Sequence, residues 1–252
     1  MIAARSHVHR IPARRAVRLA LGLVVVTAAL EFPLPAHAAR ALPTISFSGY
    51  SWTVKASSGQ VGPGPNEFSS SKNNVWVDRN GYLHLRINFS KGKWYCAEIA
   101  SQRSLGYGTY RFTLGSAVSN LDPNVVLGLF TWDDDPAYND REIDLEFSRW
   151  GNAADPTNGQ YVVQPWSGTG NLQRTTVGAN VPSNQSFSWS PGQVAFASSN
   201  GSTASWLYTG IDVPPPGNEK THLNLWLYRG RPPSNGRAAE VVIRSFSFVP
   251  AL

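Results

Sequence analysis

Three acidic side chains alternate with apolar ones in one short segment near the middle of the chain. The segment reads Arg141-Glu142-Ile143-Asp144-Leu145-Glu146-Phe147. In an extended strand, successive side chains point to opposite faces, so the three carboxyl groups share one face and the apolar residues share the other. We expect the apolar face to anchor the strand in a core. The acidic face must then border a wet cleft, because clustered carboxylates cannot be buried unpaired.

The spacing of the two glutamates suits the hydrolysis of a glycosidic bond. Residues four apart on a strand have Cα atoms about 13 Å apart, and two side chains that lean together close much of that gap. A retaining glycosidase holds two carboxyl groups roughly 5–5.5 Å apart, one as nucleophile and one as acid and base. Asp144, between Glu142 and Glu146, adds repulsion and can share a proton, which raises the pKa of a neighbouring carboxyl group.

Two other interpretations of this segment stay open on the segment alone. An exposed acidic strand face is common and needs no catalytic role. A calcium site is less favoured, since three side chains in a row on a strand do not wrap an ion as a loop does.

The composition favours strands and turns around the acidic segment. Hydrophobic residues make up 42% of the chain and charged residues only 15%, with Gly 22, Pro 18 and Trp 9. Long helices need more charged residues and alanine on their solvent face. Asn80-Gly81 predicts a hairpin turn, because both residues tolerate positive φ. The Ser/Gly/Pro-rich stretch 57–71 predicts a long surface loop.

Short strand-like segments recur along the chain with turn signals between them. No internal repeat and no helical period longer than two turns interrupts them. Many short antiparallel strands predict an all-β fold, a two-sheet antiparallel β-sandwich or jelly roll, with the acidic strand in the concave sheet. The expected strands are 74–77, 83–87, 107–114, 125–131, 142–147, 160–164, 194–197, 223–227 and 239–248.

The first 38 residues have the pattern of a secretory signal peptide. Five arginines precede an uncharged, mostly apolar run over 19–30, and Ala36-His37-Ala38 is a small-x-small cleavage site. The run is too short to favour a membrane anchor. Arg14-Arg15 fits a twin-arginine signal poorly. We expect a single domain over 39–252 that is secreted, to the extracellular space or the periplasm.

The charge and the cysteine content restrict the partners. The leader carries five arginines against one glutamate and so most of the net charge of +6. We therefore expect no nucleic-acid partner, no membrane contact after cleavage, and a monomer. Cys96 is the single cysteine, so no intramolecular disulfide can form. A buried, inert thiol is expected, because no adjacent base is visible in the sequence.

The acidic segment resembles the E-[ILV]-D-x-E-F signature of glycoside hydrolase family 16, in its lichenase branch. The resemblance implies a concanavalin A-like jelly roll. It also implies that Glu142 is the nucleophile, that Glu146 is the acid and base, and that Asp144 assists. The segment lacks the extra residue that bulges this strand in laminarinases and agarases. It is therefore similar to enzymes that act on mixed-linkage β-1,3-1,4-glucan and on xyloglucan.

Other motifs extend the resemblance over most of the chain from about Asn66 onward. They are Trp94-Tyr95-Cys96-Ala97-Glu98 with Gly106-Tyr107-Gly108-Thr109-Tyr110, Phe130-Thr131-Trp132, Val163-Gln164-Pro165-Trp166, Ser188-Trp189-Ser190-Pro191-Gly192 and Asn224-Leu225-Trp226. Indole rings cover the apolar faces of sugars while amides bind the hydroxyls. The predicted substrate-binding residues are Asn66, Glu98, Trp132, Gln164, Trp166, Asn224 and Trp226. Most of the other tryptophans are expected in the core: Trp52, Trp76, Trp94, Trp150, Trp189 and Trp206.

Several positions depart from the family pattern. The lichenase disulfide is absent, since the matching region reads Phe68-Ser69-Ser70-Ser71. Ala100 and Arg141 replace an Arg and an Asp of the family. The resemblance implies no required cofactor and leaves a structural calcium ion open. Arg244, about where lichenases carry an Asp calcium ligand, argues against that ion.

The sequence therefore predicts a secreted retaining endo-β-glucanase that hydrolyses β-1,3-1,4-glucan or a related β-glucan by double displacement. Two alternatives stay open. A transglycosylase that remodels wall glucan would use the same covalent intermediate, with sugar in place of water. A non-catalytic carbohydrate-binding jelly roll would keep the aromatic residues but would not need two glutamates around an aspartate.

Overall fold

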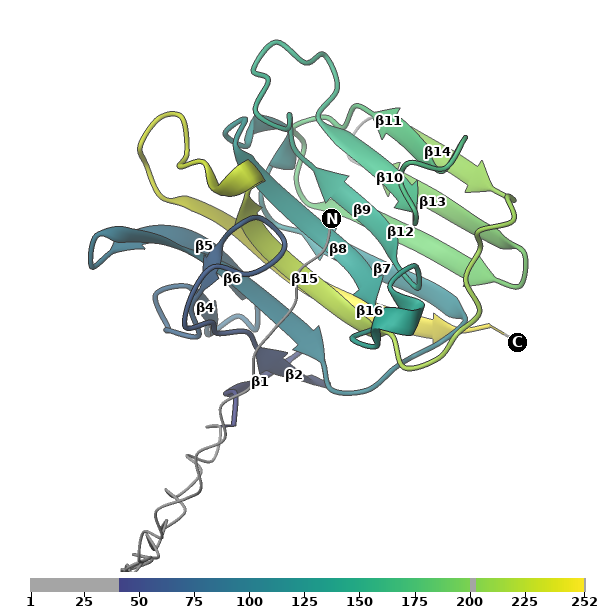
Figure 1. Cartoon of the computed structure of the whole chain (residues 1–252), viewed down its shortest axis with the longest axis horizontal. Coiled ribbons are helices and arrows are strands. Elements are labelled where there is room, and N and C mark those ends of the chain that lie inside the picture. Colours follow the sequence, from purple (N-terminus) through teal and green to yellow (C-terminus); the bar gives the residue numbers. More distant parts are fainter. Residues whose placement is uncertain (1–40, 200–202, 252) are drawn as a thin grey trace, which may run out of the picture. The chain divides into compact units, whose positions relative to one another are not determined.

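Nearly all regular structure in the computed structural model is β-strand (Figure 1), and the model describes residues 41–199 and 203–251. Three short 3-10 helices, Val118–Asn120, Pro136–Tyr138 and Tyr228–Gly230, complete the elements of this part. The strands are β1 Thr44–Phe47, β2 Tyr50–Val54, β3 Glu67–Phe68, β4 Val75–Val77, β5 Leu83–Ser90, β6 Lys93–Ser101, β7 Gly108–Leu114, β8 Val125–Trp132, β9 Ile143–Phe147, β10 Gly159–Val163, β11 Leu172–Thr175, β12 Ser183–Ser190, β13 Gln193–Ser199, β14 Thr203–Tyr208, β15 Lys220–Leu227 and β16 Ala239–Pro250.

The strands form two layers that are joined through β5. One layer has the order β11-β10-β9-β8-β15-β6, and the other has the order β16-β7-β12-β13-β14. The first part of β5, 83–87, pairs with β16, and its last part, 88–90, pairs with β6. Apart from the two-residue parallel pair of β3 with β6, the named pairs are antiparallel. The predicted antiparallel sandwich is confirmed, with its two sheets continuous along one edge.

The hydrophobic core lies between the two layers. The predicted apolar face of the acidic strand, Ile143, Leu145 and Phe147, has 0% of its surface exposed. From the neighbouring strand β10, the ring of Tyr161 stacks on that of Phe196 in β13 at 5.1 Å. Because the inner face of the β9 layer is committed to this core, its outer face is the one available for a polar site.

The strand predictions are largely confirmed, with boundaries shifted by a few residues. The hairpin at Asn80-Gly81 is confirmed, with Gly81 at φ 79° between β4 and β5. The predicted loop over 57–71 contains the short strand β3. The structure adds β1, β2, β6, β11, β12 and β14 to the predicted set.

One prediction on targeting concerns residues outside this description. The signal peptide over 1–38 lies outside the described residues and stays a prediction. Within the described ranges, no helix has the length and apolar character needed to cross a membrane.

Candidate active site

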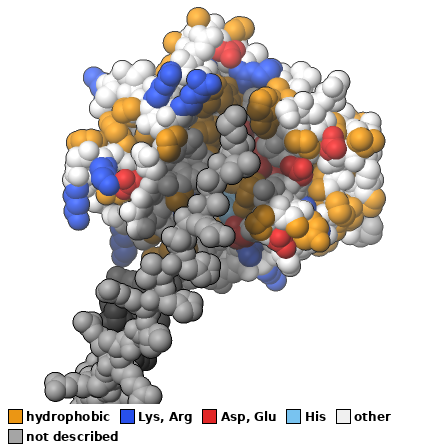
Figure 2. Space-filling view, viewed as in Figure 1, with side chains coloured by type: hydrophobic (Ala, Val, Ile, Leu, Met, Phe, Trp, Pro, Cys, Tyr) orange, Lys and Arg blue, Asp and Glu red, His pale blue; other side chains and the backbone are white. Residues whose placement is uncertain are grey.

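A cleft of about 880 Å³ crosses the outer face of the β9-β8-β15-β6 layer. Its lining includes the three predicted catalytic residues, Glu142, Asp144 and Glu146. In the space-filling view, both acidic and hydrophobic side chains are exposed on the molecule (Figure 2). The three carboxyl residues of this strand line the cleft, and its apolar residues are buried in the core. The predicted separation of an acidic side from an apolar side is confirmed.

Strand register aligns the polar side chains in rows across this layer. The row through Glu146 contains, from β6 to β11, Glu98, Asn224, Gly128, Glu146, Gln160 and Arg174. The row through Asp144 contains Ala100, His222, Phe130, Asp144 and Val162. Neighbouring strands lie about 4.7–4.9 Å apart, so side chains in one row can contact one another or one ligand.

The crowding of three carboxyl groups changes their protonation. Burial raises the pKa of Glu142 to about 8, with the charge of Glu146 acting in the same direction. Burial and the charges of Glu142 and Glu146 raise the pKa of Asp144 well above its usual range. Burial also raises the pKa of Glu146. The cluster therefore holds protons near neutral pH, because three adjacent carboxylates cannot all be ionised there.

Asp144 is placed to carry one of these protons. Its hydrogen bond with Glu142 lowers the pKa of Glu142 and raises that of Asp144, so Asp144 donates and Glu142 accepts. Gln164 fixes the other side of Asp144. The Gln164 Oε1 atom accepts from the backbone N–H of Trp166 at 2.7 Å, so its Nε2 donates to Asp144 Oδ2 at 3.0 Å.

Glu146 has a different set of partners. Gln160 Nε2 donates to Glu146 Oε2 at 2.7 Å, and Gln160 Oε1 accepts from Arg174 Nη1 at 3.1 Å. Arg174 is held by Asp155 at 2.8 Å, and its guanidinium lies 4.1 Å from the centre of the Trp150 ring. The Gln160 hydrogen bond and the Arg174 charge both lower the pKa of Glu146, against the larger effect of burial. Sequence reasoning did not find Gln160 or Arg174, whose role depends on strand register.

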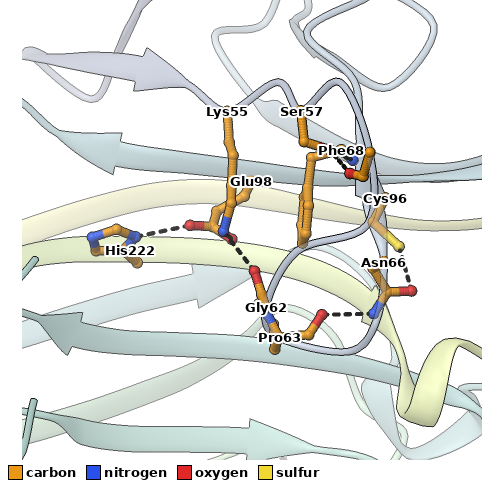
Figure 3. Close-up of polar contacts among 10 residues, drawn as sticks. Lys55, Ser57, Gly62, Pro63, Asn66, Phe68, Cys96, Glu98 and His222 are labelled. Atoms are coloured by element: carbon orange, nitrogen blue, oxygen red, sulfur yellow. Dashed lines mark hydrogen bonds and ion pairs between the residues drawn. The ribbon is translucent and has the colours of Figure 1, made fainter. Parts of the chain in front are cut away.

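Four of the seven predicted substrate-binding residues line the cleft with the three carboxyl groups: Glu98, Trp132, Asn224 and Trp226. Gln164 contacts Asp144 instead. Asn66 is 4% exposed, and its Nδ2 atom donates to the carbonyl of Pro63 (Figure 3). The same atom donates to the carbonyl of Leu227, so Asn66 ties a loop to the end of β15. Trp166 is 65% exposed and is not among the residues that line the cleft.

The core prediction for the remaining tryptophans is confirmed in part. Trp52 and Trp189 are fully buried, and Trp94 and Trp206 are half-buried against the core. Trp76 stacks on His84, with the ring centres 4.5 Å apart. Trp150 is the residue that supports Arg174.

Glu98 lies between two nitrogen atoms that the sequence did not single out. Lys55 Nζ is 2.8 Å from Glu98 Oε2, and His222 Nδ1 is 3.0 Å from Glu98 Oε1 (Figure 3). Burial would raise the pKa of Glu98, but these two partners outweigh it and lower the pKa. Glu98 is therefore an ionised acceptor at neutral pH, with both of its oxygens occupied.

Gly128 makes room in the row of Glu146. A Cβ atom at this position would lie 2.5 Å from Asn224 Oδ1. The Asn224 side chain therefore extends over Gly128 from β15 toward β9. No other residue type would leave this space open at that place in the sheet.

Two further side chains bear on reactive or metal-binding chemistry, the thiol of Cys96 and the guanidinium of Arg244. Cys96 is fully buried, and burial raises the pKa of its thiol to about 12. The guanidinium of Arg244 in β16 lies 5.6 Å from the Tyr82 ring centre. Across 41–199 and 203–251, no group of three or more His, Cys, Asp and Glu residues is arranged to hold a metal ion.

Solved structures with this fold include several that are described as glucanases. A Bacillus licheniformis β-glucanase is 21% identical, with a TM-score of 0.62, over 79% of this chain and 92% of that chain. A prokaryotic β-1,3-1,4-glucanase (lichenase) from a mouse hindgut metagenome is 21% identical, with a TM-score of 0.61, over 79% and 93%. An immunostimulatory antigen and pseudo β-1,3-glucanase of Mycobacterium tuberculosis is 19% identical, with a TM-score of 0.59, over 80% and 91%.

No protein-family model matches the chain, and no curated protein matches it in sequence. At these identities, the similar structures establish the fold, a jelly-roll β-sandwich that spans most of each chain. The activity of the site depends on its own residues and their geometry.

The raised pKa of Glu142 predicts a specific pH dependence of stability. Its pKa rises from 4.5 to about 8 on folding, so the folded state binds more protons than the unfolded state between these values. This contribution to stability is complete below pH 4.5 and is lost as the pH rises to about 8. Replacement of Glu142 by Gln, which cannot ionise, should therefore stabilise the protein increasingly across this interval.

Urea unfolding of the wild type and Glu142→Gln between about pH 4 and 9 measures this difference. The variant should gain free energy of unfolding relative to the wild type as the pH rises, and the gain should level off above the folded pKa. A difference that is constant with pH would contradict the protonation described here.

Proposed function

We propose that the chain is a retaining endo-β-glucanase of the glycoside hydrolase family 16 type, acting on β-1,3-1,4-glucan or a related β-glucan. The observation that carries the proposal is the pair of glutamates on one strand face, in one cleft, with different hydrogen-bond partners. A pair of carboxyl groups with distinct environments is what double displacement at an anomeric carbon requires. The printed names of the similar structures, β-glucanase and lichenase, support the substrate class.

In the first step, Glu142 is the nucleophile. Asp144 holds a proton and donates a hydrogen bond to Glu142, which favours the ionised form of Glu142 against the larger effect of burial. A Glu142 oxygen forms a bond to the anomeric carbon while the bond from that carbon to the leaving oxygen breaks. Glu146 gives its proton to that oxygen, and a covalent glycosyl-enzyme remains.

In the second step, Glu146 is the base. It accepts a proton from water, the water oxygen bonds to the anomeric carbon, and the ester bond to Glu142 breaks. An acid that later acts as a base needs a pKa that is raised but still accessible. Burial supplies the increase, and the Gln160 hydrogen bond and the Arg174 charge limit it.

The cleft is suited to a chain of sugar residues rather than to a single one. It crosses from β9 to β6, three strand spacings or roughly 14 Å, and β2 adds Thr53 beyond β6. Trp132 and Trp226 are half-buried in its lining, where their rings can cover the apolar faces of sugars. These features favour cleavage within a polymer, and the predicted signal peptide fits a polysaccharide substrate outside the cell.

Two other outcomes are distinguishable by experiment. A transglycosylase would use the same residues and pass the glycosyl group to a sugar. A binding protein without catalysis is favoured by one observation, the similar structure described as a pseudo β-1,3-glucanase. The intact set of Glu142, Asp144 and Glu146 in the cleft supports the hydrolase instead.

The first test is a reducing-sugar assay of the purified protein with mixed-linkage glucan, laminarin, xyloglucan and agarose. We expect release of reducing ends from mixed-linkage glucan, with a loss of about 10³-fold or more in Glu142→Gln, because the nucleophile is removed. Binding without hydrolysis of any of the four would indicate the non-catalytic alternative. New oligosaccharides longer than the substrate, formed with no net gain of reducing ends, would indicate the transglycosylase.

The second test assigns the two glutamates by azide rescue with an aryl glycoside that has a good leaving group. In Glu142→Ala, azide should fill the space of the missing nucleophile and form the α-glycosyl azide. In Glu146→Ala, azide should attack the covalent intermediate and form the β-glycosyl azide. Products of the opposite configuration would exchange the two assignments. If neither variant forms an azide product while the wild type is active, Glu142 and Glu146 are not the catalytic pair.

A further inference from the structure

His222 is a buried histidine in the cleft that the proposed chemistry does not use. It lies on β15, and its exposed fraction is 7%. Its ring stacks on Phe130 of β8 with the ring centres 5.1 Å apart, and its Nδ1 atom is 3.0 Å from Glu98 Oε1. The position of the ring is therefore fixed from two sides, by an aromatic neighbour and by a carboxylate. Figure 3 shows the contact with the Glu98 carboxylate.

The second ring nitrogen of His222 has no hydrogen-bond partner. His222 Nε2 and Asn224 Oδ1 are both buried without a partner within the protein. Six side-chain atoms of the described residues share this property, and these two are the ones that belong to residues lining the cleft. Buried polar atoms in native proteins are nearly always satisfied, so an unsatisfied pair in a cleft indicates a missing ligand.

The partner of Nδ1 determines which chemistry Nε2 offers. The Glu98 carboxylate is ionised and can only accept, so the hydrogen lies on Nδ1 of His222. In the neutral ring, Nε2 then carries a lone pair and accepts a hydrogen bond. Asn224 Oδ1 is also an acceptor. A ligand that supplies hydrogen-bond donors, as hydroxyl groups do, satisfies both of these acceptors.

We propose that His222 binds the glucan directly, by accepting a hydrogen bond from a sugar hydroxyl at Nε2, with Asn224 accepting from a second hydroxyl. This inference rests on the proposed function and adds a specificity residue to it. His222 shares a row with Asp144, two strand spacings or roughly 9–10 Å away. The sugar that it contacts therefore lies along the cleft from the reacting bond. Ala100, opposite His222, offers only a methyl group in that row.

The same acceptors specify the chemical class of the ligand. The lining of the cleft carries more acidic than basic side chains. The acidic residues are Glu98, Asp134, Glu142, Asp144 and Glu146, and the basic residues are Lys55 and Lys220. Lys55 is already paired with Glu98. A sugar with free hydroxyls and no charge satisfies these acceptors, whereas a carboxylated or sulfated sugar would be repelled by the acidic lining.

A structural role for His222 would be to hold Glu98 and nothing more. His84 offers a matched control for that alternative. Its Nδ1 atom is 2.8 Å from Glu240 Oε1, its ring stacks on Trp76, and its Nε2 atom lies 3.4 Å from Asp78 Oδ2. It lies on β5 and is not among the residues that line the cleft. The two histidines thus share a carboxylate at Nδ1 and a stacked aromatic ring, and differ in the surroundings of Nε2 and in access to the cleft.

The test is calorimetric binding of a mixed-linkage β-1,3-1,4-glucan tetrasaccharide to the full chain carrying Glu142→Gln, which prevents turnover. Adding His222→Leu should raise Kd about three- to tenfold, the loss expected for one hydrogen bond. Adding His222→Gln, which keeps an acceptor, should raise Kd less, and adding His84→Leu should leave Kd unchanged. A Kd unchanged by His222→Leu, or raised equally by His84→Leu, would overturn the inference.

A second measurement needs no substitution of the histidine. In the ¹⁵N-labelled Glu142→Gln protein, saturation with the tetrasaccharide should shift the His222 Nε2 resonance and leave that of His84 in place. An unshifted His222 resonance in the saturated complex would overturn the inference and leave the proposed function intact. If the Glu142→Gln protein binds no tetrasaccharide and the wild type hydrolyses no glucan, the proposed function is wrong, and this inference is wrong with it.

Discussion

The structure depends on holding three carboxyl groups side by side on one face of a short strand. Like charges at this spacing, partly removed from water, destabilise a folded protein unless protons and hydrogen bonds offset them. The opposite face of β9 supplies the anchor, because Ile143, Leu145 and Phe147 are fully buried in the core. The two glutamines of the β10 segment, Gln160 and Gln164, donate to the acidic face.

The same constraint divides the roles of the two glutamates. Glu142 shares a hydrogen bond with a protonated aspartate, which favours the ionised form that a nucleophile needs. Glu146 bonds to an amide whose other end meets Arg174, which keeps a raised pKa within reach of both acid and base chemistry. Gly128, opposite Glu146, leaves the space above the sheet open for a ligand and for Asn224. An asymmetric site thus arises from neighbours on β8 and β10.

The acidic strand, the sandwich fold and the hairpin at Asn80-Gly81 could be predicted because each depends on local alternation or turn chemistry. Gln160, Arg174, Lys55 and His222 could not, because their contacts depend on the pairing of strands that are distant in the chain. Strand β6 could not be predicted from the sequence for a different reason. Its residues 96–99 are all buried, so no alternation marks it. The resemblance to the family predicts that Asn66 and Trp166 bind substrate. In the fold, Asn66 ties a loop to the end of β15, and Trp166 is exposed outside the cleft.

The central claim is that Glu142 forms a covalent bond to the sugar, so that two displacements restore the configuration of the anomeric carbon. ¹H NMR of the first product that the native protein releases from mixed-linkage glucan, recorded before the anomers equilibrate, tests this claim directly. The account predicts that the β-anomer forms first and that the α-anomer appears only by mutarotation. Initial release of the α-anomer would mean a single inverting displacement by water, and Glu142 could then not be the nucleophile.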